Sequence, residues 1–241
     1  MAHTKTAALN GTLTMARSAA QTGDRKAPTL LELFWTFVIV SVLGLFAEVI
    51  VSYFLDGRWE SRAGLIWGPF SPIYGLGAVL LTFLLYPLRD HPVRLFAASA
   101  FLGGAFEYVA GWFWETFFGI VAWSYIDQPF NLGGHTCLGI ALVWGLAGML
   151  WFRWGYPAIH AGVASVPTRP RRAITTVAAV LLAADIALTL VAFNCWFDRQ
   201  AGQPIEGPVA QFCATYYGDS FMANRFETMS MWTSLAHNHI A

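Results

Sequence analysis

The chain has 241 residues and zero formal net charge; 12% of the residues are charged and 56% are hydrophobic. A soluble domain usually carries about 25% charged residues, so this composition excludes a water-soluble globular protein of this length. The zero net charge also argues against a nucleic-acid partner. The apolar residues form blocks close to the roughly 20 residues that cross a bilayer, so the lipid bilayer is the first partner that the sequence predicts.

Five apolar blocks predict an all-α fold, a polytopic bundle of about five transmembrane helices. A helix is the expected state because only helices and closed barrels satisfy backbone polar groups in lipid, and the alternation of barrel strands is missing. We predict a disordered cytoplasmic tail over residues 1–29, the bundle over 30–197 and an external tail over 198–241. The blocks are expected at 30–55, 70–88, 93–123, 136–156 and 173–197.

The positions of Lys and Arg predict the orientation of the bundle. Ten of them fall in the N-terminal tail and in the second and fourth connections, whereas four fall in the first connection and the C-terminal tail. The positive-inside rule therefore places the N-terminus in the cytoplasm and the C-terminus outside.

A stretch rich in Gly and Pro precedes the second block. Residues 62–77 hold two prolines and four glycines, which make a poor straight helix. Such a stretch suits a re-entrant or broken segment, which is tolerated at membrane depth only where it packs in protein or lines a cavity. The alternative is a tight turn followed by a Gly-rich packing face.

Acidic residues inside the membrane blocks are the main candidates for function. Glu48 lies toward the outer end of the first block. Gly103, Glu107, Gly111 and Glu115 recur every four residues in the third block, so they form one ridge that another helix can approach closely. A carboxylate within the membrane normally has a partner or faces water, and it is a functional candidate by default. The alternative is a structural pair with Arg or His that holds helices together.

The third connection, residues 123–135, brings further polar groups to the same side. It has no Lys or Arg, and it offers Asp127, Asn131 and His135 close to the predicted outer end of Glu115. His135 can exchange protons near neutral pH or bind a carboxylate, or it is a surface histidine without a role. Asp185 in the fifth block is a weaker candidate that is expected to bond a neighbouring hydroxyl.

Common catalytic signatures are missing from the sequence. It has no phosphate-binding glycine loop followed by Lys and Ser or Thr, no His-Glu-x-x-His and no Gly-x-Ser-x-Gly. We therefore assign no catalytic residue and no metal site, and the sequence does not identify a cofactor. If ATP drives the protein, another subunit hydrolyses it.

Several unusual motifs occur in order along the chain: Gly44-Leu-Phe-Ala-Glu48, Gly-Pro-Phe-Ser-Pro-Ile-Tyr-Gly-Leu-Gly at 68–77, the segments 107–115 and 130–138, and 221–229 in the tail. Together they resemble the bacterial membrane family called putative ABC-transporter type IV permease. The resemblance runs from about residue 33 to 230. It implies a divergent member in the bacterial inner membrane, with other membrane subunits, or an ATPase subunit if transport uses ATP, as partners.

Two departures from the family pattern concern arginines. Where the family usually has Asn-Arg-Gly before the Gly-Pro motif, this chain has Arg62-Ala63-Gly64, so one arginine is displaced or lost. Where the family usually has Gly-Arg-x-Cys-Leu, this chain has His135 in place of the second arginine. If those arginines hold an anionic group or pair with the glutamates, the site of this protein is altered.

The three cysteines fall at the outer side in the predicted topology, where an oxidising periplasm permits a disulfide. We favour a bond between Cys195 and Cys213, because the loop between them is short, over three unpaired thiols packed as small apolar groups. The bond would fold the tail over the helix ends and bring Arg225 above the acidic site, as a replacement for the arginine that became His135.

These patterns favour a transporter or permease for a small solute or ion, with a polar site open to the outer side. The alternative is an accessory or scaffold subunit of a larger membrane complex, and a third hypothesis is an intramembrane enzyme using paired carboxylates as acid and base. The candidate site consists of Glu48, Arg62, Glu107, Glu115, Asp127, Asn131, His135 and Arg225.

Overall fold

The computed structural model describes residues 27–118, 121 and 123–227. It confirms the predicted helical membrane bundle, because four helices of the described residues are long and apolar enough to cross a bilayer. The expected second span is shorter than the others. The four long spans are Leu30–Phe54, Pro92–Phe117, Leu138–Ser165 and Thr168–Gln200, and the shorter apolar segment is Pro72–Leu88.

Helix α2, Leu30–Asp56, has a sequence signal at each end. The Thr29 hydroxyl accepts from the Glu32 N–H at 3.3 Å, and the Glu32 carboxylate accepts from the Thr29 N–H at 2.7 Å, which is a reciprocal capping box. Gly57 ends the helix with a φ of 72°, a left-handed conformation that glycine adopts without steric cost. The chain therefore turns back at Gly57.

Residues 58–71, which we call the returning segment, run back into the bundle without forming a helix or strand. The N–H of Ser71 donates to the carbonyl oxygen of Ser41 at 3.0 Å, and Ser41 lies near the middle of α2. The next helix, α3, Pro72–Leu85, therefore starts partway along α2 and continues into the short turn η1, Tyr86–Leu88. This late start explains why the second span is short, and the predicted broken segment before it is confirmed.

The backbone of this returning segment has partners on helix α7, Thr168–Gln200. The N–H of Ile66 donates to Thr189 Oγ1 and the N–H of Trp67 donates to Asp185 Oδ1, both at 3.0 Å. Both acceptors are buried and lie near the middle of α7. Protein groups thus satisfy irregular backbone at a depth where lipid offers no hydrogen bonds.

Helix α4, Pro92–Phe118, packs along α5, Leu138–Leu150. Gly103 of α4 lies against the ring of Trp144 of α5, and a Cβ there would approach Trp144 Cδ2 to 2.5 Å. The absence of a side chain at Gly103 is therefore what allows the two helices to approach so closely.

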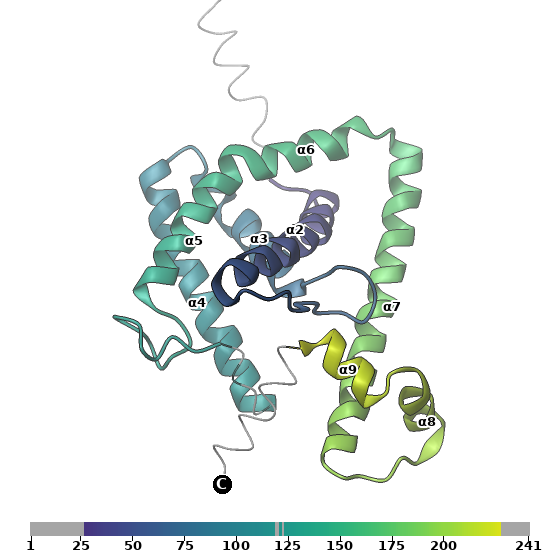
Figure 1. Cartoon of the computed structure of the whole chain (residues 1–241). Coiled ribbons are helices and arrows are strands. Elements are labelled where there is room, and N and C mark those ends of the chain that lie inside the picture. The colour runs from purple at the N-terminus through teal and green to yellow at the C-terminus, as the bar shows by residue number, and fades with distance from the viewer. Residues whose placement is uncertain (1–26, 119–120, 122, 228–241) are drawn as a thin grey trace, which may run out of the picture.

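The fourth predicted block ended at residue 156, which is wrong, because the helix continues to Ser165. A π-helical turn, η2, Trp151–Gly155, follows α5 and leads into α6, Tyr156–Ser165. Pro157 then stands in the first turn of α6, where its missing N–H costs little. Figure 1 shows α6 crossing from α5 toward α7.

The described part of the C-terminal region packs against the lower end of α7 in Figure 1, as helices α8, Gly207–Tyr216, and α9, Asp219–Arg225. Arg199 near the end of α7 holds this arrangement, because its guanidinium contacts Asp219 at 2.8 Å and donates to Tyr217 O at 2.9 Å. A hydrophobic cluster joins α7, the C-terminal region and the returning segment. Its buried residues are Ile66, Ala192, Trp196, Tyr217, Met222 and Phe226.

Candidate functional site

Glu48 of α2 belongs to a polar group that includes Arg62 of the returning segment and Tyr74 of α3. Its carboxylate accepts a hydrogen bond from the Tyr74 hydroxyl and lies 3.6 Å from Arg62 Nη1. Gly44, one turn before Glu48, gives room for the Tyr74 ring, since a Cβ there would lie 2.7 Å from Tyr74 Cδ2. The Gly-Leu-Phe-Ala-Glu motif therefore positions an acid and its tyrosine partner together.

Arg62 is shared between two acids. Its Nη2 donates to Glu60 Oε2 at 2.9 Å in addition to the longer contact with Glu48, and the Glu60 side chain is 3% exposed. Arg58 Nη2 also lies 2.5 Å from Glu60. Arg62 therefore faces Glu48, and Glu60 is a partner that the sequence analysis did not select.

Glu107 of α4 accepts hydrogen bonds from neutral donors. The Tyr125 hydroxyl donates to its Oε1 at 3.1 Å, the Thr136 hydroxyl to its Oε2 at 3.5 Å, and the Trp144 side chain bonds it as well. Among the ion pairs formed by the described residues, none includes Glu107. Glu107 is thus a half-buried carboxylate inside a membrane helix with donors around it but no cation.

Glu115 and His135 form the contact of the ridge nearest the C-terminal end of α4. His135 Nε2 lies 3.4 Å from Glu115 Oε2, with His135 15% exposed and Glu115 53% exposed. A Cβ at Gly111 would approach His135 Nδ1 to 3.1 Å, so this glycine makes room for the imidazole. Tyr108 completes the surroundings with an edge-on ring contact at 5.3 Å.

Tyr125 is the loop residue whose hydroxyl donates to Glu107. Burial, followed by the charge of Glu107 and its hydrogen bond, raises the pKa of the Tyr125 hydroxyl above its ordinary range, and the charge of Glu48 adds to the shift. The hydroxyl therefore stays protonated and donates. Tyr125 is thus a loop partner of Glu107 that sequence reasoning did not select.

The structure does not bring Asp127 and Asn131 into this group. The Asp127 side chain is exposed. Asn131 donates to Ile126 O at 2.9 Å and to Gln128 O at 3.0 Å, and its own oxygen accepts from Gly134 N–H at 3.3 Å. Asn131 therefore holds the shape of its own loop, which is a common role for a side-chain amide beside glycines.

Arg225, expected above the acidic site, contacts the returning segment. Its guanidinium donates from Nε to Leu65 O at 3.0 Å and also donates to Gly68 O. Burial lowers the pKa of Arg225 and the charge of Asp185 opposes that shift. Arg225 thus satisfies carbonyl groups of the returning segment, while Asp185 accepts from the N–H of Trp67 in that segment.

The structure holds Cys137, Cys195 and Cys213 as buried free thiols. Cys213 and Cys195 are in side-chain hydrogen-bond contact, and burial together with that contact raises the pKa of Cys213 to about 11. The pairing of Cys195 with Cys213 stays a prediction, and α8 carries Cys213 back to Cys195 of α7.

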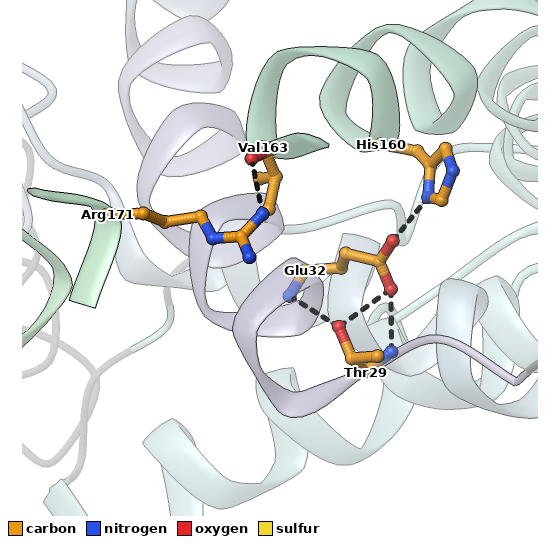
Figure 2. Close-up of polar contacts among 5 residues, drawn as sticks. All are labelled: Thr29, Glu32, His160, Val163 and Arg171. Atoms are coloured by element: carbon orange, nitrogen blue, oxygen red, sulfur yellow. Dashed lines mark hydrogen bonds and ion pairs between the residues drawn. The ribbon is translucent and has the colours of Figure 1, made fainter. Parts of the chain in front are cut away.

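A second polar group, which sequence reasoning missed, lies at the opposite end of α2 (Figure 2). Glu32 accepts from Thr29 and is hydrogen-bonded to His160 of α6. Arg171 of α7 donates to Val163 O nearby at 2.9 Å. The Thr-x-x-Glu capping box was a signal in the sequence, but nothing local connects Glu32 with His160, which lies 128 residues away.

No three His, Cys, Asp or Glu side chains of the described ranges come together as metal ligands. The family model described as Putative ABC-transporter type IV matches residues 35–190, which is more than half of the chain. No curated protein matches the chain. No solved structure matches it either.

Proposed function

Since the chain belongs to the family described as Putative ABC-transporter type IV, we propose that it is a transport subunit that binds a small cation or cationic solute at Glu107. The observation that carries this proposal is the character of the Glu107 donors. Tyr125, Thr136 and Trp144 are neutral, so they orient the carboxylate without neutralising its charge. A carboxylate within a membrane span then needs a proton or a cation from outside the chain.

The other two acids of the site contrast with Glu107. Glu48 has Arg62 and Glu115 has His135, which are the partners expected of structural pairs. We assign them to positioning: Glu48 holds Arg62 and Tyr74 at the returning segment, and Glu115 holds His135 over Gly111. Glu107 is the acid whose charge is left for a ligand.

The aromatic surroundings of Glu107 support a positively charged ligand. The Tyr125 and Trp144 side chains that bond the carboxylate are both aromatic. Aromatic faces attract ammonium groups, and the attraction grows where water is excluded. A ligand with an ammonium group would therefore gain from the carboxylate and from the rings together.

The proposal includes the partners and the orientation predicted from sequence. The chain has no phosphate-binding loop, so ATP-driven transport would require an ATPase subunit on the cytoplasmic side. The Lys and Arg distribution supports an inner-membrane protein whose N-terminus is cytoplasmic and whose Glu107 site opens outward.

A second candidate function is an accessory or scaffold subunit. The hydrogen bonds that engage both oxygens of Glu107 favour it, because a carboxylate bonded by Tyr125 and Thr136 also links α4 to the loop before α5. In that case Glu107 would fix the structure and bind no solute.

Thermal unfolding in detergent with a panel of inorganic cations and small amines tests the proposal. A ligand present at about 100 times its Kd stabilises the folded state by roughly 2.7 kcal/mol. We expect at least one compound to raise the Tm of the wild type, and the shift to be lost in Glu107→Gln. Glu206→Gln, an exposed site outside the bundle, is the matched control. An equal shift in Glu107→Gln, or no shift with any compound, would favour the scaffold.

A further inference from the structure

An apolar groove lies between α2, the η2–α6 segment and the start of α7. Its volume is about 460 Å³. Trp35 Nε1 donates to Thr175 Oγ1 at 3.0 Å and so joins α2 to α7 beside the groove. The lining side chains include Trp35, Ile39, Leu43, Trp151, Ile159 and Ile174.

The groove runs along a membrane span. From Trp35 to Leu43 its wall follows α2 for about 12 Å, and this stretch belongs to the apolar span Leu30–Phe54. Anything that occupies the groove over this length must be apolar, because no water is present there to solvate polar groups. An acyl chain of a lipid meets this requirement.

A polar cavity of about 390 Å³ adjoins the groove, and Val163 and Arg171 line both. Arg171 donates from Nη1 to Val163 O, while its Nε is buried and has no hydrogen-bond partner among the described residues (Figure 2). Arg172 also lines the cavity. Both arginines belong to the first five residues of α7, whose N-terminus adds positive partial charge.

One acid, Glu32, lines the polar cavity, and its carboxylate is already hydrogen-bonded within the protein. Glu32 accepts from the N–H and hydroxyl of Thr29 and is hydrogen-bonded to His160. The cavity therefore presents two arginines and a helix N-terminus toward any group that enters it. A phosphate diester meets these donors better than a neutral or cationic group does.

We propose that this groove and cavity bind one anionic phospholipid, with an acyl chain along α2 and the phosphate at Arg171 and Arg172. The apolar wall and the cationic end are continuous, as a single amphipathic ligand requires. Basic clefts between membrane helices on the cytoplasmic side favour anionic headgroups, and the charge count assigns this end of the bundle to the cytoplasm. A phosphatidylcholine headgroup would bring its own cation against the arginines.

Native mass spectrometry of the full chain in detergent, titrated with phosphatidylglycerol or with phosphatidylcholine of the same acyl chains, tests this proposal. Each arginine near an anionic surface is worth roughly fivefold in affinity, so we expect phosphatidylglycerol to bind about tenfold more tightly or better. Soluble glycerol phosphate should not displace it, because the acyl chain supplies part of the affinity. Equal binding of the two lipids would overturn the proposal.

Two kinds of variant locate the site. Arg172→Gln, and Arg171→Gln with it, should reduce the preference for phosphatidylglycerol, whereas Arg153→Gln, an exposed arginine outside both cavities, should not. Gly162→Leu should reduce binding of both lipids, since Gly162 lines the groove and a Cβ there meets no atom within 4 Å.

Gly139→Leu is the control for the groove, because Gly139 is an exposed helical glycine of α5 with only Cys137 Sγ nearby, at 3.8 Å. The proposal fails if Arg172→Gln keeps the full lipid preference or if Gly162→Leu binds lipid as well as Gly139→Leu does. Retention of the wild-type Tm by each variant shows that a loss of lipid is not a loss of fold.

Discussion

The main-chain N–H of Trp67 donates to Asp185 Oδ1 at 3.0 Å, which joins the returning segment to the middle of α7. Asp185 also accepts from Thr189 at 3.5 Å. Because Arg225 bonds the carbonyl groups of the same segment, the segment has charged partners for both its donors and its acceptors. This arrangement allows irregular backbone to stand beside the candidate site at membrane depth.

Replacing Asp185 by alanine should destabilise the protein. The Trp67 N–H would lose its acceptor in a buried setting, a loss that costs about 1–3 kcal/mol. Asp185→Asn keeps an oxygen acceptor and should fall between the wild type and Asp185→Ala. Thermal unfolding in detergent measures the order, with Asp198→Ala, an exposed acid of the same helix, as the control. Equal stability of Asp185→Ala and Asp198→Ala would show that the segment does not depend on this bond.

Cys195 and Cys213 are expected to form a disulfide in protein isolated from an oxidising compartment. Because burial raises the pKa of Cys213 to about 11, little thiolate exists near neutral pH and alkylation must be done after unfolding. Mass spectrometry of the unreduced, unfolded protein should find one alkylated cysteine, Cys137, and two linked ones. Three alkylated cysteines would contradict the pairing and leave α8 held by packing and by the contacts of Arg199.

The predicted orientation is checked by labelling single cysteines from outside the cell. A probe at residue 235 should react with an impermeant reagent, and a probe at residue 10 should react only after the membrane is opened. The expectation rests on the ten-to-four distribution of Lys and Arg. The reverse labelling pattern would place the Glu107 site on the cytoplasmic side.

Most of the helices and the broken segment could be predicted from local patterns. The length of an apolar block predicts a span, and a high Gly and Pro content predicts a break, without knowledge of distant contacts. The end of the fourth block was misplaced, since a π turn before Pro157 lets the helix continue and no sequence pattern marks such a turn. The ridge from Gly103 to Glu115 was readable from its four-residue spacing.

The partners of the site residues were less predictable than the residues themselves. Tyr125 reaches Glu107 across 18 residues and Arg225 reaches Leu65 across 160, gaps in sequence that no periodicity measures. Arg225 was expected above the acidic site, but the packing of α9 on α7 turns it toward carbonyl groups of the returning segment. Asn131 was selected as a polar side chain, but the hydrogen bonds of its amide go to backbone groups of its own loop.

Uptake into proteoliposomes tests the proposed role of Glu107 most directly. The chain, purified from native membranes together with the subunits that accompany it, would be reconstituted and supplied with ATP and with a cation or amine that raises the Tm of the wild type. We predict accumulation of that compound by the wild type and by Glu206→Gln, and at least tenfold slower uptake by Glu107→Gln. Uptake by Glu107→Gln at the wild-type rate would contradict the assignment of Glu107 as the solute site.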